Sequence, residues 1–234
     1  MTDTNFASRL AAVEERIRSA AQRSGRSFAS ITLVAVSKKF SASAMVEAYA
    51  GGIRHFGENY VQEFAAKKAE LAGLREATFH LIGHLQSNKT NQASRLFQVI
   101  HTIDSPKLLQ RLDTAAVERN ILLNALLEIR LSDEETKSGA EAAELPCLLD
   151  AAAKCRKVKV VGLMTMPPWS EDAELSRPYF QRLAELARKY GLPELSMGMS
   201  NDFEVAIEEG ATMIRVGTAL FGARPKPING GSPD

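Results

Sequence analysis

The sequence has almost no excess of either charge, with 29 basic and 28 acidic residues among 234 and a formal net charge of +1. Without a basic or acidic field, the chain has no global attraction to nucleic acid or to a membrane surface. No apolar stretch approaches the roughly 20 residues that a membrane-spanning helix needs. The N-terminus, MTDTNFASRL, also lacks the basic start and apolar run of a secretory signal. These absences predict a cytoplasmic protein that binds neither nucleic acid nor membranes.

Cysteine and histidine are also scarce. The two cysteines, Cys147 and Cys155, lack a CxxC spacing, which argues against a disulfide framework or a zinc site. We expect both thiols to be reduced and packed. His80 and His84 have an HxxxH spacing, but Gly83 and a change from strand to loop lie between them, so they would not form a helical metal-binding pair. The sequence therefore predicts no metal site.

What the sequence does contain is a repeated alternation of short apolar runs and helical patterns. The apolar runs are residues 31–36, 53–56, 78–82, 98–102, 122–129, 158–164, 194–197 and 212–216. The helical patterns are residues 42–50, 60–72, 89–96, 106–118, 140–154, 173–190 and 202–209. Strands that alternate with helices form βα units and a parallel sheet.

The number of strands predicts whether this sheet is open or closes into a barrel. The runs are apolar on both parities, as in strands that are covered on two faces. Eight such strands in about 200 residues predict an α/β fold with a single closed (β/α)8 barrel of TIM type. An open doubly wound sheet is the alternative, and the absence of GxGxxG after the first strand weighs against it.

The segment before the first strand is expected to form an extra helix. Residues 4–23 have helical spacing with one apolar stripe, and residues 24–30 are rich in turn formers. We therefore divide the chain into an N-terminal helix and linker that pack on the barrel (residues 1–30), the barrel (31–224) and a flexible C-terminal tail (225–234).

Polar side chains collect where the predicted strands end. In a barrel of this type the active site is built from the loops at the C-terminal ends of the strands. Lys38 and Lys39 directly follow the first strand, and Asn59 follows the second. Gly217 and Thr218 follow the eighth strand, next to the first in a closed ring. These loops are therefore expected to meet.

The segment GMSND at 198–202 follows the seventh strand and has the composition of an anion site. Gly198 allows close approach of the backbone. Ser200 or Asn201 would cap the next helix, with Glu204 completing a capping box. Free N–H groups at a helix start favour a phosphate, and such barrels often hold one in the loops after strands seven and eight. A plain helix cap with a tight turn is the alternative.

Arg215 lies inside the eighth predicted strand, where an unpaired charge would be costly. One explanation is a salt bridge to a carboxylate such as Glu58 or Asp104. The other is contact with a bound anion or a ring nitrogen. Closing the barrel would bring Arg215 beside Lys38 or Lys39.

A lysine, an arginine and a phosphate site at one barrel mouth fit a Schiff base with pyridoxal 5′-phosphate (PLP). Schiff-base formation needs a neutral amine, and burial beside a cation lowers the pKa of a lysine. A phosphosugar aldolase would use the same parts. The residues alone therefore indicate a carbonyl ligand with a phosphate.

Seven ordered segments span nearly the whole chain and carry a resemblance. They are AVSK at 35–38, HFGENYVQE at 55–63, HLIGHLQSNK at 80–89, HTID at 101–104, SDEETKSG at 132–139, GLMTM at 162–166 and SMGMSNDFEVAIEEGATMIRVGTALFGAR at 196–224. Together they resemble the YggS/PROSC family of PLP homeostasis proteins, which is similar to the barrel domain of alanine racemase. The resemblance implies a fold type III PLP-binding protein.

The resemblance also implies roles for particular residues. The Schiff-base lysine would be Lys38, in AVSK, with no covalent role for Lys39. Asn59 would lie near the cofactor ring. The residues expected to bind the phosphate are Ser200, Arg215, Gly217 and Thr218. The resemblance leaves open whether Arg215 faces the phosphate or the pyridine nitrogen.

Whether such a protein turns over a substrate depends on a second acid–base group. In alanine racemase the base opposite the lysine is a tyrosine from a C-terminal domain, and this chain ends ten residues after FGAR, so we expect that domain to be missing. We predict a monomeric, non-enzymatic carrier that holds or delivers PLP, with PLP-dependent apoenzymes as candidate recipients. A small racemase or lyase that recruits Tyr60 or His84 is the alternative.

Overall fold

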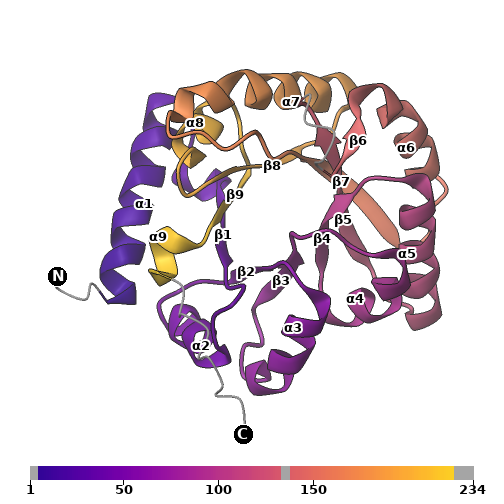
Figure 1. Ribbon diagram of the computed structural model, residues 1–234, viewed down its shortest axis with the longest axis horizontal. Helices are drawn as coiled ribbons and strands as arrows, with labels where there is room; N and C mark the ends of the chain where they lie inside the picture. Colours follow the sequence, from indigo (N-terminus) through magenta and orange to yellow (C-terminus); the bar gives the residue numbers. More distant parts are fainter. Residues whose placement is uncertain (1–4, 133–137, 224–234) are drawn as a thin grey trace, which may run out of the picture.

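The computed structural model describes residues 5–132 and 138–223, and eight of its parallel strands close into a barrel (Figure 1). These strands are Thr32–Val36 (β1), His55–Glu58 (β2), Thr78–Leu81 (β3), Val99–Ile103 (β4), Leu123–Arg130 (β5), Val158–Met164 (β7), Glu194–Met199 (β8) and Met213–Val216 (β9). Strand β9 pairs with β1, which places Arg215 opposite Val34, and the pairing of β4 with β5 completes the ring. The predicted closed barrel is confirmed. The predicted tail, residues 225–234, lies outside the described residues.

Helices surround the strands on the outside of the ring (Figure 1). They are Phe6–Arg23 (α1), Ala42–Ala50 (α2), Val61–Lys67 (α3), Thr90–Leu96 (α4), Pro106–Arg119 (α5), Leu145–Ala152 (α6), Arg177–Tyr190 (α7), Phe203–Glu208 (α8) and Thr218–Phe221 (α9). Two of them begin at serine caps, because the side chains of Ser41 and Ser105 accept main-chain N–H groups of the first turn. None of the described helices has the length and apolar character to cross a bilayer.

The helix predicted over residues 140–154 is shorter in the structure. A two-residue strand, Ala140–Glu141 (β6), pairs with the end of β5, and a 3₁₀ turn, Ala142–Glu144, follows it. Helix α6 begins only at Leu145, with a proline in its first turn. Proline lacks an N–H and fits the start of a helix but not its interior, so it marks this boundary.

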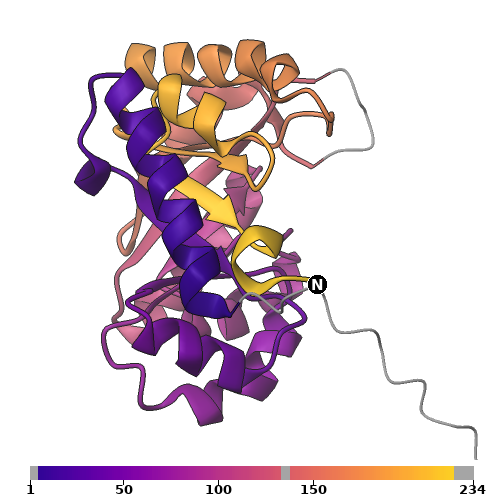
Figure 2. The ribbon, with the colours of Figure 1, turned by 90° about the vertical axis from the view of Figure 1, so that its left-hand side faces the viewer.

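Helix α1 covers the outside of β1 and β9, where helix α9 has only four residues (Figures 1 and 2). Its buried stripe contains Phe6, Leu10, Val13 and Ile17, the stripe expected from the sequence. Two ion pairs of 2.8 Å attach it to α8, Arg16 with Glu204 and Arg23 with Glu208. The N-terminal helix thus takes the place of a long eighth barrel helix.

The main apolar core lies between the strands and the surrounding helices, and only a small apolar cluster lies apart from it. This second cluster consists of Val99, Leu126 and Met164. Side chains alternate between the two faces of a strand, and these three residues face the inside of the barrel. Branched aliphatic residues usually fill that space. Much of the remaining interior is polar.

The two cysteines are free, but only one is packed as expected. Cys147 is exposed on α6. Cys155 is half-buried, and burial raises the pKa of its thiol to about 11. Cys155 therefore stays a thiol at neutral pH and is a poor nucleophile.

Candidate functional site

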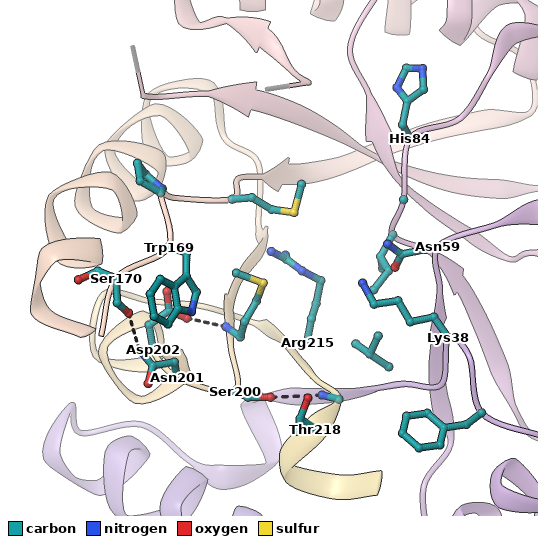
Figure 3. Close-up of a pocket in the computed structure, with 18 residues that line it drawn as sticks. Lys38, Asn59, His84, Trp169, Ser170, Ser200, Asn201, Asp202, Arg215 and Thr218 are labelled. Atoms are coloured by element: carbon teal, nitrogen blue, oxygen red, sulfur yellow. Dashed lines mark hydrogen bonds between the residues drawn. The ribbon is translucent and has the colours of Figure 1, made fainter. Parts of the chain in front are cut away.

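A cavity of about 410 Å³ lies at the C-terminal end of the barrel, where the loops after several strands meet. Its size is within the range of small-molecule and cofactor sites, roughly 300–1,000 Å³. The six residues singled out from the sequence all line it, namely Lys38, Asn59, Ser200, Arg215, Gly217 and Thr218. In Figure 3, Lys38 and Arg215 extend toward the middle of the cavity from two sides, and Ser200 and Thr218 lie together at one end.

The turn after β1 separates the two lysines. Lys38 is half-buried and lines the cavity, whereas Lys39 is exposed and does not. The backbone of Lys39 has φ 65°, in the left-handed region that non-glycine residues rarely adopt. Its N–H donates to Glu63 Oε1 at 2.6 Å, which fixes this conformation. The geometry therefore favours Lys38 as the reactive amine.

A buried ion pair supports the same turn. The Lys67 ammonium lies 2.8 Å from Glu58 Oε1 and 2.9 Å from Glu63 Oε1. It also donates to the main-chain carbonyls of Ser37 and Phe40, at 3.3 and 3.1 Å. Burial raises the pKa of Glu58, and Lys67 opposes that rise. Nothing in the sequence indicates this role for Lys67, because helical periodicity does not reveal which turn the end of a helix contacts.

Arg215 is almost fully buried, with 3% of its surface exposed, and its hydrogen-bond acceptors are neutral. Nη1 donates to the carbonyl and the hydroxyl of Ser196, at 2.8 and 2.6 Å, and Nη2 donates to the Thr165 carbonyl at 3.0 Å. The salt bridge considered from the sequence, to Glu58 or Asp104, is wrong, and in the described part of the chain Arg215 forms no ion pair. Burial lowers the pKa of Arg215 to about 10, so it remains a cation at neutral pH.

The loops after β8 and β9 meet at one end of the cavity. The N–H of Gly217 donates to Ser200 Oγ at 3.4 Å, and Thr218 lies beside them (Figure 3). Gly198 has φ +90°, and a Cβ there would lie 2.5 Å from the Ala206 side chain. Only glycine therefore fits this turn, which brings Ser200 next to Gly217. Two hydroxyls and a main-chain N–H at one end form a suitable anion cradle.

The predicted capping box in this segment is wrong. Helix α8 begins after Asp202, not after Ser200 or Asn201. Asp202 instead folds back and accepts the N–H of Met199 at 2.7 Å, which closes the turn of the cavity wall. Aspartate is as good a turn and cap former as serine or asparagine, so the short motif did not distinguish them.

Close packing of two loops places Asn59 in the cavity wall. A Cβ on Gly83 would lie 2.3 Å from the main-chain oxygen of Asn59. Glycine at this position therefore lets the loop after β3 lie directly against the loop after β2. The sequence alone does not indicate this contact between Gly83 and Asn59.

The rim of the cavity is partly apolar and open. Trp169 lines it with 75% of its surface exposed, and Met166 lies beside the same opening. His84 also lines the cavity, with Nδ1 3.9 Å from Asp104 Oδ2. Tyr60 is 55% exposed at the start of α3 and does not line the cavity. Of the two alternative acid–base residues considered from the sequence, only His84 reaches the site.

A closed barrel with a lysine and an anion cradle at its mouth fits the class of PLP-binding proteins. Comparison with known proteins supports this class. The family model described as "Alanine racemase, N-terminal domain" matches residues 8–225. A pyridoxal phosphate homeostasis protein of Pseudomonas aeruginosa is 44% identical, with 94% of this chain and 96% of that protein covered. Another, of Aquifex aeolicus, is 43% identical, with 94% and 99% covered.

A solved structure is also similar. PipY of Synechococcus elongatus PCC7942, determined with PLP bound, is 41% identical and superposes with a TM-score of 0.81, covering 93% of this chain and all of that one (100%). The chain therefore belongs to the pyridoxal phosphate homeostasis protein family, as the seven sequence segments indicated.

Proposed function

We propose that this protein binds PLP, holds it as a Schiff base on Lys38 and acts in intracellular PLP homeostasis with little or no turnover. The observation that supports this most directly is one cavity with an amine at one side and an anion cradle at the other. Lys38 provides the amine, and Ser200, Gly217 and Thr218 form the cradle. The PLP-bound structure of a relative that is 41% identical supports the same cofactor.

The residues present fit this cofactor chemically. When bound, PLP supplies an aldehyde that condenses with a primary amine and a ring that withdraws electrons. The chain supplies Lys38 for the aldehyde, hydroxyl and main-chain donors for the phosphate, and the Arg215 cation on the side of the cavity facing Lys38 (Figure 3). Because its acceptors are neutral, Arg215 keeps its positive charge for an anionic ligand. Asn59 completes the wall beside Lys38.

Borohydride reduction tests this attachment directly. We expect the purified protein with added PLP to show a visible absorbance band that borohydride removes, and peptide mapping to find the reduced adduct on Lys38. Lys38→Ala should abolish the adduct, while the neighbouring variant Lys39→Ala should keep it. An adduct mapped to Lys39, or one unchanged in Lys38→Ala, would contradict the proposal.

A carrier role is favoured by what surrounds Lys38. Racemisation needs a second acid–base group on the other face of the cofactor, and no tyrosine of the described residues lines the cavity. His84 does line it, and it is the residue that an enzymatic function would use. Incubating the loaded protein with L-amino acids in D₂O separates the two functions. We expect no α-deuteration beyond that of free PLP, and sustained exchange that is lost in His84→Ala would support the enzyme instead.

The organisation of the chain and its partners are part of the same proposal. We propose one barrel domain (residues 31–224) with an outer N-terminal helix and linker (1–30), acting as a monomer in the cytoplasm, with PLP-dependent apoenzymes as recipients. Light scattering tests the monomer. Transfer of PLP to an added apoenzyme, compared between wild type and Lys38→Ala, tests the recipient.

A further inference from the structure

A continuous chain of hydrogen bonds crosses the interior of the barrel next to Arg215. His55 Nδ1 lies 3.0 Å from His80 Nε2, and His80 Nδ1 lies 2.8 Å from His101 Nε2. His101 Nδ1 lies 2.8 Å from Ser196 Oγ, which accepts from Arg215 at 2.6 Å. The chain thus joins β2, β3, β4, β8 and β9 across a space that aliphatic residues usually fill.

Counting donors fixes the direction of this chain. A guanidinium only donates, so Ser196 Oγ is an acceptor toward Arg215. The single hydroxyl hydrogen of Ser196 then goes to its other partner in the described residues, His101 Nδ1. A neutral imidazole has one donor and one acceptor, so His101 donates from Nε2 to His80 Nδ1, and His80 donates from Nε2 to His55 Nδ1. All three histidines are therefore Nε2–H tautomers.

Burial disfavours a charge on the two inner histidines of this hydrogen-bond chain. His80 and His101 are 1% and 0% exposed. Burial and the neighbouring His55 lower the pKa of His80 to about 3, and the pKa of His101 lies well below its ordinary value because of burial, His80 and Arg215. The histidines do not form a metal site, since no group of His, Cys, Asp or Glu in the described part of the chain is arranged to hold a metal ion.

Two carboxylates act on the charge of Arg215. Asp202, before α8, and Glu128, on β5, attract its charge from a distance, but neither forms an ion pair with it in the described residues. A direct carboxylate partner would cancel the charge that an anionic ligand meets. A polarised chain of neutral groups binds the guanidinium without cancelling it, and successive bonds in such a chain strengthen one another.

We propose that Ser196, His101, His80 and His55 are positioning residues for Arg215, forming a one-directional chain that fixes its guanidinium at the cavity while leaving its charge for the bound anion. This rests on the proposed function only in taking that anion to be PLP. The direction of the chain is a property of the protein without a cofactor.

Imidazole NMR of the cofactor-free protein tests the direction. The protein has only four histidines, so two-bond ¹H–¹⁵N correlations resolve each ring. His84, on the exposed loop, is the internal reference. We expect His80 and His101 to give the neutral Nε2–H pattern between pH 8 and pH 6, and His55 to give it at pH 8. An Nδ1–H pattern for His101, or a charged His80 or His101 in this range, would overturn the proposal. This experiment is independent of PLP binding.

Breaking the chain at Ser196 tests its effect on Arg215. Ser196→Ala removes one acceptor from Arg215, and we expect the Kd for PLP, measured by absorbance, to rise about tenfold. Ser196→Thr keeps the hydroxyl and should restore most of the affinity. Ser94→Ala, at a buried serine on α4 that donates to the Asn91 carbonyl, is the matched control and should leave the Kd unchanged.

The outcomes are distinguishable. Unchanged affinity in Ser196→Ala would overturn the positioning role. If Ser196→Ala does not fold, the loss of affinity expected in His101→Leu and its partial recovery in His101→Asn, which keeps an acceptor near the position of Nδ1, decide the same question. If wild type itself does not bind PLP, the proposed function fails, while the NMR result still stands or falls on its own.

Discussion

The Lys67 ammonium lies 2.8 Å from the Glu58 carboxylate, and both groups are buried against the turn that carries Lys38. The same ammonium donates to the carbonyls of Ser37 and Phe40, on either side of the two lysines. The turn that carries Lys38, the lysine that we propose binds the cofactor, is therefore held in place by a second lysine. Buried charges of this kind are costly to separate, because the partner that remains has no solvent around it.

Removal of Lys67 should destabilise the protein and loosen the Lys38 turn. Lys67→Met leaves Glu58 buried without its partner, and we expect a loss of about 3–5 kcal/mol in unfolding free energy, measured by urea denaturation. Slower formation of the borohydride-reducible adduct should accompany it.

Two variants control for this effect. Lys68→Met makes the same change one residue later, where the ammonium lies over the Phe79 ring rather than under the turn, and should change the rate of adduct formation little. The double variant Lys67→Met with Glu58→Gln removes both charges and should recover part of the stability. If Lys67→Met and Lys68→Met behave alike, the support that we assign to Lys67 is wrong.

A methyl group at Gly83 should disturb the cavity. Because a Cβ would lie 2.3 Å from the main-chain oxygen of Asn59, Gly83→Ala must push the loops after β2 and β3 apart. Overpacking of this kind costs about 1–3 kcal/mol. Gly73→Ala, where a Cβ meets nothing within 4 Å, is the matched control and should leave Tm and PLP affinity unchanged. Equal effects of the two substitutions would show that the contact with Asn59 is unimportant.

Trp169 should report ligand binding. It is the only tryptophan in the sequence and lies on the rim of the cavity, so a bound chromophore there will quench its fluorescence. We expect quenching to saturate together with the absorbance change during a PLP titration. Trp169→Phe should remove the signal and leave the affinity from absorbance within about twofold, because three-quarters of this side chain (75%) is exposed. Absence of quenching in a protein that forms the adduct would place the cofactor away from this rim.

The sequence was sufficient for the architecture because the architecture depends on repeated, local signals. Eight apolar runs with helices between them predict a parallel barrel whatever the details, and closure then places Arg215 beside Lys38. The predicted boundaries that are wrong are those that a single residue determines. Helix α6 starts late because of one proline, and the turn after β8 is closed by Asp202 rather than by Ser200.

Partners across the barrel could not be predicted in the same way. The sequence leaves open whether Arg215 pairs with a carboxylate or contacts a ligand, and in the structure its protein partners are Ser196 and carbonyl groups. The link from Ser196 through His101 depends on which side chains meet inside a closed ring, which strand parity alone does not give. One feature of the sequence does indicate this link, since His55, His80 and His101 lie on three consecutive strands.

Glu128 should make stability depend on pH, in the direction opposite to ordinary carboxylates. It is 2% exposed, and its Oε2 has no hydrogen-bond partner in the described residues. Burial, with a smaller contribution from Asp104, raises its pKa from 4.5 to about 7. Between pH 4.5 and 7 the unfolded chain releases this proton while the folded chain keeps it. The stability that Glu128 contributes is therefore complete below pH 4.5 and is lost as the pH rises to about 7.

Glu128→Gln isolates this effect, because glutamine keeps the shape and does not titrate. Relative to wild type, the variant should gain about 3 kcal/mol of unfolding free energy between pH 4.5 and pH 8, as follows from a pKa difference of roughly two and a half units. Urea denaturation at several pH values measures it. The control is Glu118→Gln, the same substitution at an exposed position on α5. A difference that stays constant with pH for Glu128→Gln would mean that Glu128 is ionised in the folded protein and is compensated by the Arg215 charge.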